Sequence, residues 1–390
     1  NLRAALSWAQ ESGETEIGLR LAGALWRFWE LHGHLSEGRG WLEELLVSAG
    51  NSATVAAAVR RTALHGAATL AYRQGAYEHA TALYGESQAL ARELGDKRGI
   101  ALALNSLGWV AMDQGDYGRA TALLEESLAL RRALGDNEGI AIALNDAANV
   151  AAMQGDYGRA TAIYEESLAL ARAMRDKSLI SLSLGNQGAM AIDQGDYGRA
   201  TPLLEESLAL RRELGDTGNV AGVLANLGGI AQAQGSYERA ATLYEESLAL
   251  SRRVGNKRLG ATCLEGLAGV ACVQGDYEHA GAQYGESLAL CRTLGNKRLG
   301  ANCLEGLARV GCALGQMERA ARLCGAAAAV RDAIGAPLTP VERAGYDSTI
   351  TALRAALGDA AFAAAWEVGA AMGFEQAVAA ALAETANAYT

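Results

Sequence analysis

Length, composition and charge set the first limits on this chain of 390 residues. Half of its residues are apolar, but an excess of Asp and Glu gives a net charge of −10. We do not expect this segment to bind nucleic acid, because that function usually requires a basic stripe along the phosphate backbone. Apolar runs fall well short of the roughly 18 residues of a membrane span, and the start does not resemble a signal peptide. These features predict a cytoplasmic protein.

Residues 1–53 are predicted to form diverged N-terminal helices and a first helix pair. The large apolar residues of this segment are Trp26, Trp29 and Trp41. Gly33 lies between them, where a helix would end and the chain would turn. The segment therefore has the composition of a helix pair without the exact repeat that follows it.

Residues 54–336 contain seven copies of a unit of 40 residues. The segment Gln-Gly-Asp-Tyr-Gly-Arg-Ala occurs at 114–120, 154–160 and 194–200, with degenerate copies at 74–80, 234–240, 274–280 and 314–320. A second signature, Glu-Glu-Ser-Leu-Ala-Leu, follows at 125–130, 165–170, 205–210 and 245–250. A fixed period of this length indicates a stacked array, which buries a continuous core between neighbouring units.

Each unit is predicted to hold two antiparallel helices. From Lys97 to Asp113 the apolar residues recur at intervals of three and four, which is the pattern of one helical face. Gly115 can take the left-handed conformation that ends a helix, and Asp116 can cap the next helix, which should stop at Gly135. The short gaps force adjacent helices to be antiparallel neighbours. No strand pattern occurs, so we expect an all-α fold.

Two further features of the repeat predict packing. An alanine recurs at Ala120 and its equivalents, and Gly or Ala recurs at Gly108 and its equivalents, so the paired helices can approach closely. A tyrosine recurs at Tyr117 and its equivalents, and we expect it to fill the space between pairs. The tail, residues 337–390, loses the period. Its three Ala-rich stretches, divided near Gly358 and Gly373, are predicted to form a helical cap.

Motifs for catalysis are missing from the sequence. It has no phosphate-binding loop and no Gly-x-Ser-x-Gly elbow, and its five histidines are scattered. The paired Glu125 and Glu126 recur from repeat to repeat beside arginines, which is typical of a solvated helix face. The six cysteines include two pairs of equivalent repeat positions and form no Cys-x-x-Cys pair, so we expect buried reduced thiols. We predict no enzyme activity, no cofactor and no metal.

The run at 105–130 resembles the tetratricopeptide consensus. Its Leu-Gly, Gly-x-Tyr, Ala and final Leu positions all match, although the usual first-helix Trp is Leu104 and the closing Pro is absent. The resemblance implies a right-handed α-solenoid. The unit of 40 residues, longer than the family's usual form, is similar to the repeats of bacterial signal-transduction ATPases of the STAND class, including LuxR/MalT-like regulators.

Both ends of the chain extend that second resemblance. Residues 1–9 and 25–42 resemble the segment that joins the ATPase and winged-helix part of such regulators to their repeats. Residues 331–337 and 360–366 resemble the way these proteins end. The resemblance, together with a start at Asn1 that is not Met, implies a nucleotide-binding domain upstream in a longer parent chain.

The resemblance also implies where a partner would bind, because the first helix of each pair lines the inner, concave groove of such arrays. Positions mapped onto that face vary while the packing positions repeat. Trp109 is larger than its equivalents, so it is a candidate anchor for a partner, or it packs against neighbouring first helices. The candidates are His65, Tyr72, Arg73, Asn105, Trp109, Asp113, Asn145, Asn149, Asp193, Glu265, Glu305 and Arg309.

Two functions remain open at this stage. The first is the sensor region of a STAND-type regulator, in which a protein, peptide or small effector in the groove changes the array. The second is a stand-alone scaffold that joins protein partners. The cationic face that binds peptide C-termini in some arrays is not expected, since only Arg73 and Arg309 lie among the candidates.

Overall fold

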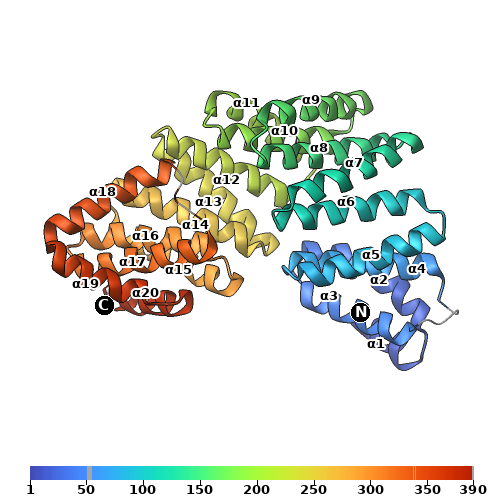
Figure 1. Cartoon of the computed structure of the whole chain (residues 1–390), viewed down its shortest axis with the longest axis horizontal. Helices are drawn as coiled ribbons and strands as arrows, with labels where there is room; N and C mark the ends of the chain where they lie inside the picture. The colour runs from blue at the N-terminus through green and yellow to red at the C-terminus, as the bar shows by residue number, and fades with distance from the viewer. Residues whose placement is uncertain (51–54, 337, 339, 389–390) are drawn as a thin grey trace. The chain divides into compact units, whose positions relative to one another are not determined.

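The structure is a computed structural model that describes residues 1–50, 55–336, 338 and 340–388. In that part of the chain all regular elements are α-helices, 20 in number, which confirms the all-α prediction. The chain divides into two compact units, Asn1–Leu214 and Gly215–Thr390 (Figure 1). The boundaries predicted at residues 53–54 and 337 lie outside the described residues, so that division stays a prediction.

The first unit begins with three helices that precede the exact repeat. They are α1 (Leu2–Glu11), α2 (Thr15–Leu31) and α3 (Leu35–Ala49), and the turn between α2 and α3 contains Gly33 as predicted. Four repeat pairs follow: α4 (Ala57–Arg73) and α5 (Tyr77–Glu93), α6 (Lys97–Asp113) and α7 (Tyr117–Leu134), α8 (Asn137–Met153) and α9 (Tyr157–Met174), α10 (Lys177–Asp193) and α11 (Tyr197–Glu213).

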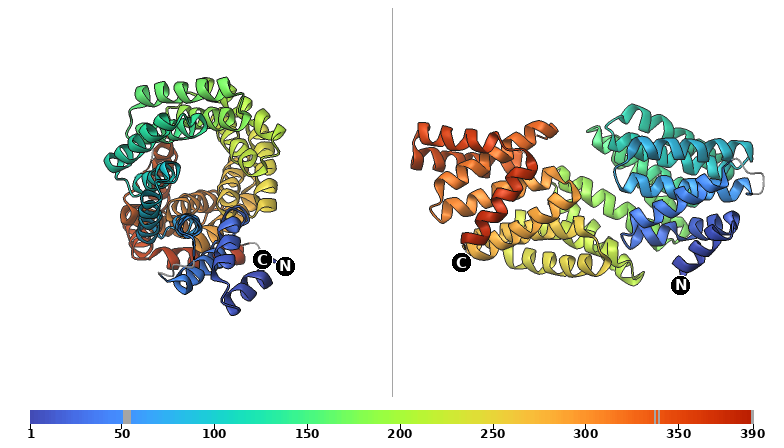
Figure 2. Two further views of the ribbon diagram at one scale, coloured as in Figure 1. Left: turned by 90° about the vertical axis from the view of Figure 1, so that its right-hand side faces the viewer. Right: turned by 90° about the horizontal axis from the view of Figure 1, so that it is seen from below.

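The second unit contains the remaining three pairs and the tail. The pairs are α12 (Thr217–Ala233) and α13 (Tyr237–Val254), α14 (Lys257–Gln274) and α15 (Tyr277–Leu294), α16 (Lys297–Ala313) and α17 (Met317–Ile334). The tail forms α18 (Pro340–Leu357), α19 (Asp359–Ala370) and α20 (Phe374–Ala388), which confirms three helices divided near Gly358 and Gly373. Figure 2 shows, from two further sides, the helices of each unit lying side by side.

The helix ends follow the local rules that the sequence predicted. Helix α6 has the predicted bounds, and Gly115 after it has φ +79°. The Asp116 carboxylate accepts a hydrogen bond from the Arg119 backbone N–H at 3.0 Å, so it caps α7. Gly135 ends α7 in the left-handed conformation. Arg175 occupies the position equivalent to Gly135 and has φ +55°, a conformation that favours glycine.

Small residues lie where the two helices of a pair cross. Ala120 and its equivalents in the other six repeats are fully buried. A Cβ atom on Gly108 would lie 2.9 Å from Leu124, and one on Gly188 would lie 2.6 Å from Leu204. These distances leave no space for a side chain, which confirms that the recurring small residues set the close approach.

A buried serine joins the two helices in every repeat pair from α4–α5 to α14–α15, a role that the sequence analysis did not assign. The Ser127 hydroxyl donates to the Ala101 carbonyl at 2.8 Å, and Ser287 donates to Ala261 at 2.8 Å. Both serines are fully buried. The same bond occurs 40 residues apart at Ser167, Ser207 and Ser247. The serine of the second signature therefore recurs because it hydrogen-bonds to the first helix.

The outer faces of the second helices are linked by exposed ion pairs. Arg132 contacts Glu166 at 2.7 Å, and Arg159 contacts Glu125 at 3.3 Å. The same register brings Arg172 to Glu206 and Arg252 to Glu286. Exposed pairs contribute between about 0 and 1 kcal/mol each. The recurring glutamates thus form the solvated face that the sequence predicted.

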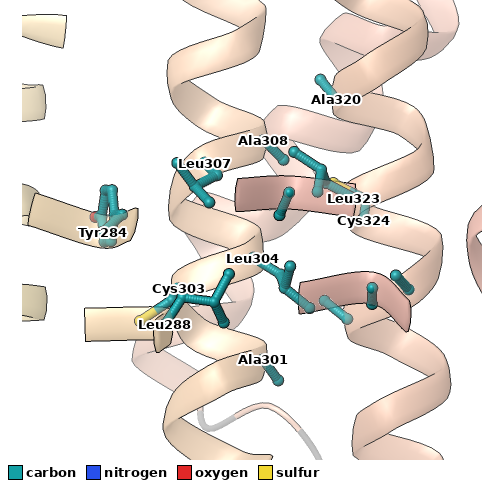
Figure 3. Packing of buried hydrophobic residues seen from close by; sticks show 14 of the residues in the cluster. Tyr284, Leu288, Ala301, Cys303, Leu304, Leu307, Ala308, Ala320, Leu323 and Cys324 are labelled. Atoms are coloured by element: carbon teal, nitrogen blue, oxygen red, sulfur yellow. The ribbon is translucent and has the colours of Figure 1, made fainter. Parts of the chain in front are cut away.

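The core of the second unit continues into the tail. Figure 3 shows the buried side chains that α15, α16 and α17 contribute to this core. Helix α19 approaches α17 so closely that a Cβ on Gly325 would lie 2.3 Å from the Trp366 carbonyl oxygen. Leu353 of α18 and Phe362 of α19 belong to the same buried cluster. The tail therefore packs against the last repeat, as expected for a cap.

Candidate functional site

The first helices of the repeats provide the surface on which the candidates were placed. In the first unit α4, α6, α8 and α10 contact one another in succession, and in the second unit α12, α14 and α16 do the same. Contacts between successive second helices are fewer. We call the solvent side of these two helix rows the first-helix surface of each unit.

His65 lies below the first-helix surface of the first unit. Its ring is 5.9 Å from the Trp26 ring and 5.3 Å from the Tyr84 ring. Burial, aided by repulsion from Arg61 and Arg27, lowers the pKa of His65 to about 4. The residue is 8% exposed and neutral near pH 7, so the expectation that it is exposed was wrong.

Three other candidates form contacts between helices at the edge of this surface. The Tyr72 hydroxyl of α4 donates to the Asp113 carboxylate of α6 at 2.8 Å. The Arg73 guanidinium pairs with Glu30 of α2 at 2.6 Å. Tyr72 is half-buried, whereas Arg73 and Asp113 are exposed. These side chains hold neighbouring helices together while remaining partly open to solvent.

Asn105 and Trp109 of α6 converge on Asp146 of α8. The Asn105 amide donates to Asp146 at 2.6 Å, and the Trp109 side chain adds a second hydrogen bond. Burial raises the pKa of Asp146 to about 6, although both hydrogen bonds and Arg131 oppose the shift. Asn105 is 7% exposed, so the expectation of exposure was wrong for it. Trp109 is half-buried, and its role as an anchor stays a prediction.

The remaining candidates of the first unit differ in exposure. Asn145 is fully buried and donates to the Ala141 carbonyl at 3.0 Å and to the Ser167 hydroxyl, so the expectation of exposure was wrong. Asn149 is half-buried and accepts a hydrogen bond from the Tyr164 hydroxyl. Asp193 is exposed.

The second unit brings its three candidates together in one pocket. Glu265 of α14 and both Glu305 and Arg309 of α16 line a cavity of about 130 Å³. Cys324 of α17 forms part of the wall. The tail helix α18 contributes Gly345, Tyr346 and Thr349 to the lining, and Asn302 of α16 is the remaining lining residue.

Arg331 of α17 fixes two of the lining residues. Its guanidinium makes a bidentate pair with Glu305, at 2.7 and 3.0 Å, and donates to the Asn302 side-chain oxygen at 2.7 Å. The Arg331 and Glu305 side chains are 5% and 14% exposed. A bidentate pair of this kind neutralises the carboxylate and fixes its orientation.

Arg309 is held in a different way, by a neutral partner. Its guanidinium donates to the hydroxyl of Tyr284 at 3.0 Å, and burial raises the pKa of that phenol. The carboxylates of Glu265 and Glu305 attract the guanidinium electrostatically. Burial likewise raises the pKa of Tyr346, so its hydroxyl is neutral near pH 7. The pocket therefore combines charges of both signs with neutral hydroxyl groups.

Comparison with known proteins identifies the repeats. The model of the tetratricopeptide repeat family matches residues 59–133, 100–173 and 179–253. The repeats of this chain are tetratricopeptide repeats. Over 113 residues the chain is 34% identical to HTH-type transcriptional regulators of Mycobacterium tuberculosis and Mycobacterium bovis. That match spans 28% of this chain and only 13% of the length of each regulator.

Two solved structures show the same tetratricopeptide fold. One is the apo form of the quorum sensor NprR from B. thuringiensis, with 16% identity, a TM-score of 0.58 and coverage of 83% of this chain and 92% of NprR. The other is a Signal Transduction ATPase with Numerous Domains from Pyrococcus horikoshii that has a tetratricopeptide repeat sensor. It also has 16% identity and a TM-score of 0.58, and the match covers 90% of this chain and 55% of the ATPase. Likeness at this identity shows the fold alone.

Three residues that hold or line the candidate positions were missed from the sequence. Asp146 could have been found, since its equivalents Ser106 and Asn186 are uncharged. Arg331 could also have been found, because its position varies among the repeats, from Ala91 and Ala171 to Arg131. Tyr346 lies in the tail, where no period marks it as unusual.

The described part of the chain has neither a membrane-spanning helix nor a cluster of metal-ligating side chains. None of its helices is long and apolar enough to cross a bilayer. Among the same residues, no three or more His, Cys, Asp or Glu side chains are grouped to hold a metal ion.

Proposed function

We propose that this chain is a binding array that acts as the sensor region of a STAND-type regulator. The observation that carries the proposal is the pocket of the second unit, where three variable residues of the first helices meet the tail helix α18. An effector in that pocket would contact the last repeats and the cap together. Its binding energy could therefore change how the cap packs, which is the differential contact that a sensor needs.

The regulator part of the proposal draws on the relatives. A tetratricopeptide repeat sensor forms part of the ATPase from Pyrococcus horikoshii, and the mycobacterial proteins are named as transcriptional regulators. We propose a nucleotide-binding domain upstream of Asn1, a cytoplasmic location and no nucleic-acid contact by this acidic segment. A protein or peptide on the first-helix surface is a second kind of partner that the same array could hold.

We propose no catalytic role and no cofactor. The buried polar groups described above are used within the fold: Glu305 pairs with Arg331, and Asp146 accepts hydrogen bonds from Asn105 and Trp109. Such groups orient helices and neighbouring side chains, and they are not arranged as a nucleophile with a base.

The test uses the parent protein. Its gene is expected to encode a nucleotide-binding domain before Asn1, and the substitution Tyr346→Ala in the pocket is expected to change the rate of ATP hydrolysis without changing ATP affinity. Arg298→Gln is the control, since Arg298 is an exposed residue of α16 outside the pocket. A parent gene without such a domain would reject the sensor proposal and favour the stand-alone scaffold.

A further inference from the structure

The size of the pocket in the second unit limits what it can hold. Its volume of about 130 Å³ is close to that of an engineered protein cavity of about 150 Å³ that holds one benzene molecule. Pockets for drug-sized ligands measure about 300–1,000 Å³. The occupant is therefore a small polar molecule, with on the order of five heavy atoms inside the cavity.

The charges of the pocket indicate what groups that molecule carries. Glu305 is neutralised by its bidentate pair with Arg331. Arg309 donates to a neutral phenol, and the carboxylates of Glu265 and Glu305 attract its guanidinium. Glu265 provides a second carboxylate on the same wall. A simple anion would be repelled by Glu265, and a simple cation would be repelled by Arg309.

We infer that the pocket binds a small α-amino acid as a zwitterion. The ligand carboxylate would contact Arg309 and the ligand ammonium would contact Glu265, while the Tyr346 and Thr349 hydroxyls supply neutral hydrogen bonds from α18. Charge-assisted hydrogen bonds are about twice as strong as neutral ones, so both ionic groups of the ligand matter. This inference rests on the proposed binding function and names the class of its ligand.

The ligand also joins two parts of the second unit. Arg309 belongs to α16, whereas Tyr346 and Thr349 belong to α18. A molecule that contacts both helices stabilises their packing, because it binds only when they are together. Backbone amides of α18 are therefore expected to exchange hydrogen more slowly when the pocket is filled.

The experiment measures binding of glycine, L-alanine and L-serine to the purified chain by titration calorimetry. N-acetylglycine, which lacks the ammonium, and glycinamide, which lacks the carboxylate, are titrated in parallel. At least one free amino acid is expected to bind, and each blocked analogue is expected to bind about tenfold more weakly or worse. Hydrogen exchange in α18 should slow with the free amino acid alone.

Substitutions of Arg309 and Glu265 test whether these side chains bind the two charged groups of the ligand. Arg309→Gln and Glu265→Gln are each expected to weaken amino-acid binding by about tenfold or more, since each removes one ionic contact. Arg298→Gln on α16 and Glu245→Gln on α13 are the matched controls, because both residues are exposed and lie outside the pocket. Circular dichroism shows whether each variant keeps its helices.

Either of two outcomes would overturn the inference. One is the absence of binding by all three amino acids, and the other is equal binding of glycine and its blocked analogues. The proposed sensor function would survive both outcomes if Tyr346→Ala still changed ATP hydrolysis in the parent protein. A parent gene without a nucleotide-binding domain would reject the sensor function and leave a measured amino-acid site in place.

Discussion

The two units use the variable positions of one repeat in different ways. In the first unit these positions carry polar side chains that contact the next first helix, as Tyr72 contacts Asp113 and Asn105 contacts Asp146. In two repeats of the second unit the position of Asp146 is glycine, at Gly266 and Gly306, and tyrosine rings of the preceding repeats pack there, as the Trp26 ring packs against Gly66 in the first unit. The first unit is thus joined by polar contacts along its first helices, and the second leaves a charged pocket beside its cap.

The difference shows that a variable position does not by itself indicate a binding site. The side chains at the variable positions 105 and 145 form hydrogen bonds inside the fold. Those at the variable positions 265, 305 and 309 line a cavity. The four predictions below test this comparison, beginning with the largest expected effect.

Arg331→Ala is expected to destabilise the second unit by about 3–5 kcal/mol, because it leaves the carboxylate of Glu305 largely buried and unpaired. Arg131 occupies the equivalent position in the first unit, but it donates to Ser127 at 3.2 Å and lies 3.8 Å from Asp136. Arg131→Ala should therefore cost only about 1–2 kcal/mol. Urea unfolding measures both values, with hydrogen exchange to assign the loss to α16 and α17. Equal losses of unfolding free energy in the two variants would show that the ion pair with Glu305 stabilises the second unit no more than the contacts of Arg131 stabilise the first.

Asp146→Asn tests the buried carboxyl of the first unit. The folded-state pKa is raised from 3.8 to about 6, so the folded state binds more protons than the unfolded state between these values. Wild-type stability therefore falls as the pH rises through this window, by about 3 kcal/mol from this group. The variant lacks the titrating group and should lose less stability over the same range.

Urea unfolding of wild type and Asp146→Asn at several pH values between about 4 and 7 checks this prediction. The difference in free energy of unfolding should shift in favour of the variant as the pH rises. A difference that stays constant across the range would mean that Asp146 titrates alike in the folded and unfolded chain, and that its burial has little electrostatic effect.

Gly306→Ser introduces into the second unit the residue of one first-unit repeat, in which Ser106 occupies the equivalent position. A Cβ atom on Gly306 would lie 2.3 Å from the Tyr284 ring, and the hydroxyl of that ring holds Arg309. We expect a loss of about 2 kcal/mol by urea unfolding, since the ring must move. The reverse change, Ser106→Gly, should cost about 1 kcal/mol or less, from helix propensity. Wild-type stability for Gly306→Ser would show that the ring repacks freely.

Local structure was predictable from the sequence because its causes are local. The bounds of α6 and the cap at Asp116 follow from apolar spacing and from side chains within three residues of the helix end. Because the unit repeats, the same spacing and capping rules predict the helices of every pair. The three helices of the tail were predicted in the same way, from glycines between Ala-rich stretches.

The site was only partly predictable because its contacts are not local. A period shows which residues are equivalent, but not whether a polar side chain finds a partner 41 residues away, as Asn105 finds Asp146. For that reason His65, Asn105 and Asn145 were placed at the surface although they are buried. Glu265, Glu305 and Arg309 were among the candidates on the first helices and line one pocket, but Tyr346, which lines the same pocket, comes from a tail without a period.

Substitution of Arg175 is expected to have the smallest effect. It tests whether the glycine that the period places after each second helix is preferred for its backbone conformation. The period places a glycine at the end of each second helix, but Arg175 takes that position with φ +55°. A left-handed conformation costs a residue with a Cβ atom about 1–2 kcal/mol, so Arg175→Gly should stabilise the first unit by about 1 kcal/mol. Gly135→Ala is the matched control and should destabilise by about 1 kcal/mol, because Gly135 is also left-handed. Thermal unfolding of the two variants should therefore shift in opposite directions. A shift in the same direction would mean that contacts of the Arg175 side chain, and not its backbone, decide the stability of this turn.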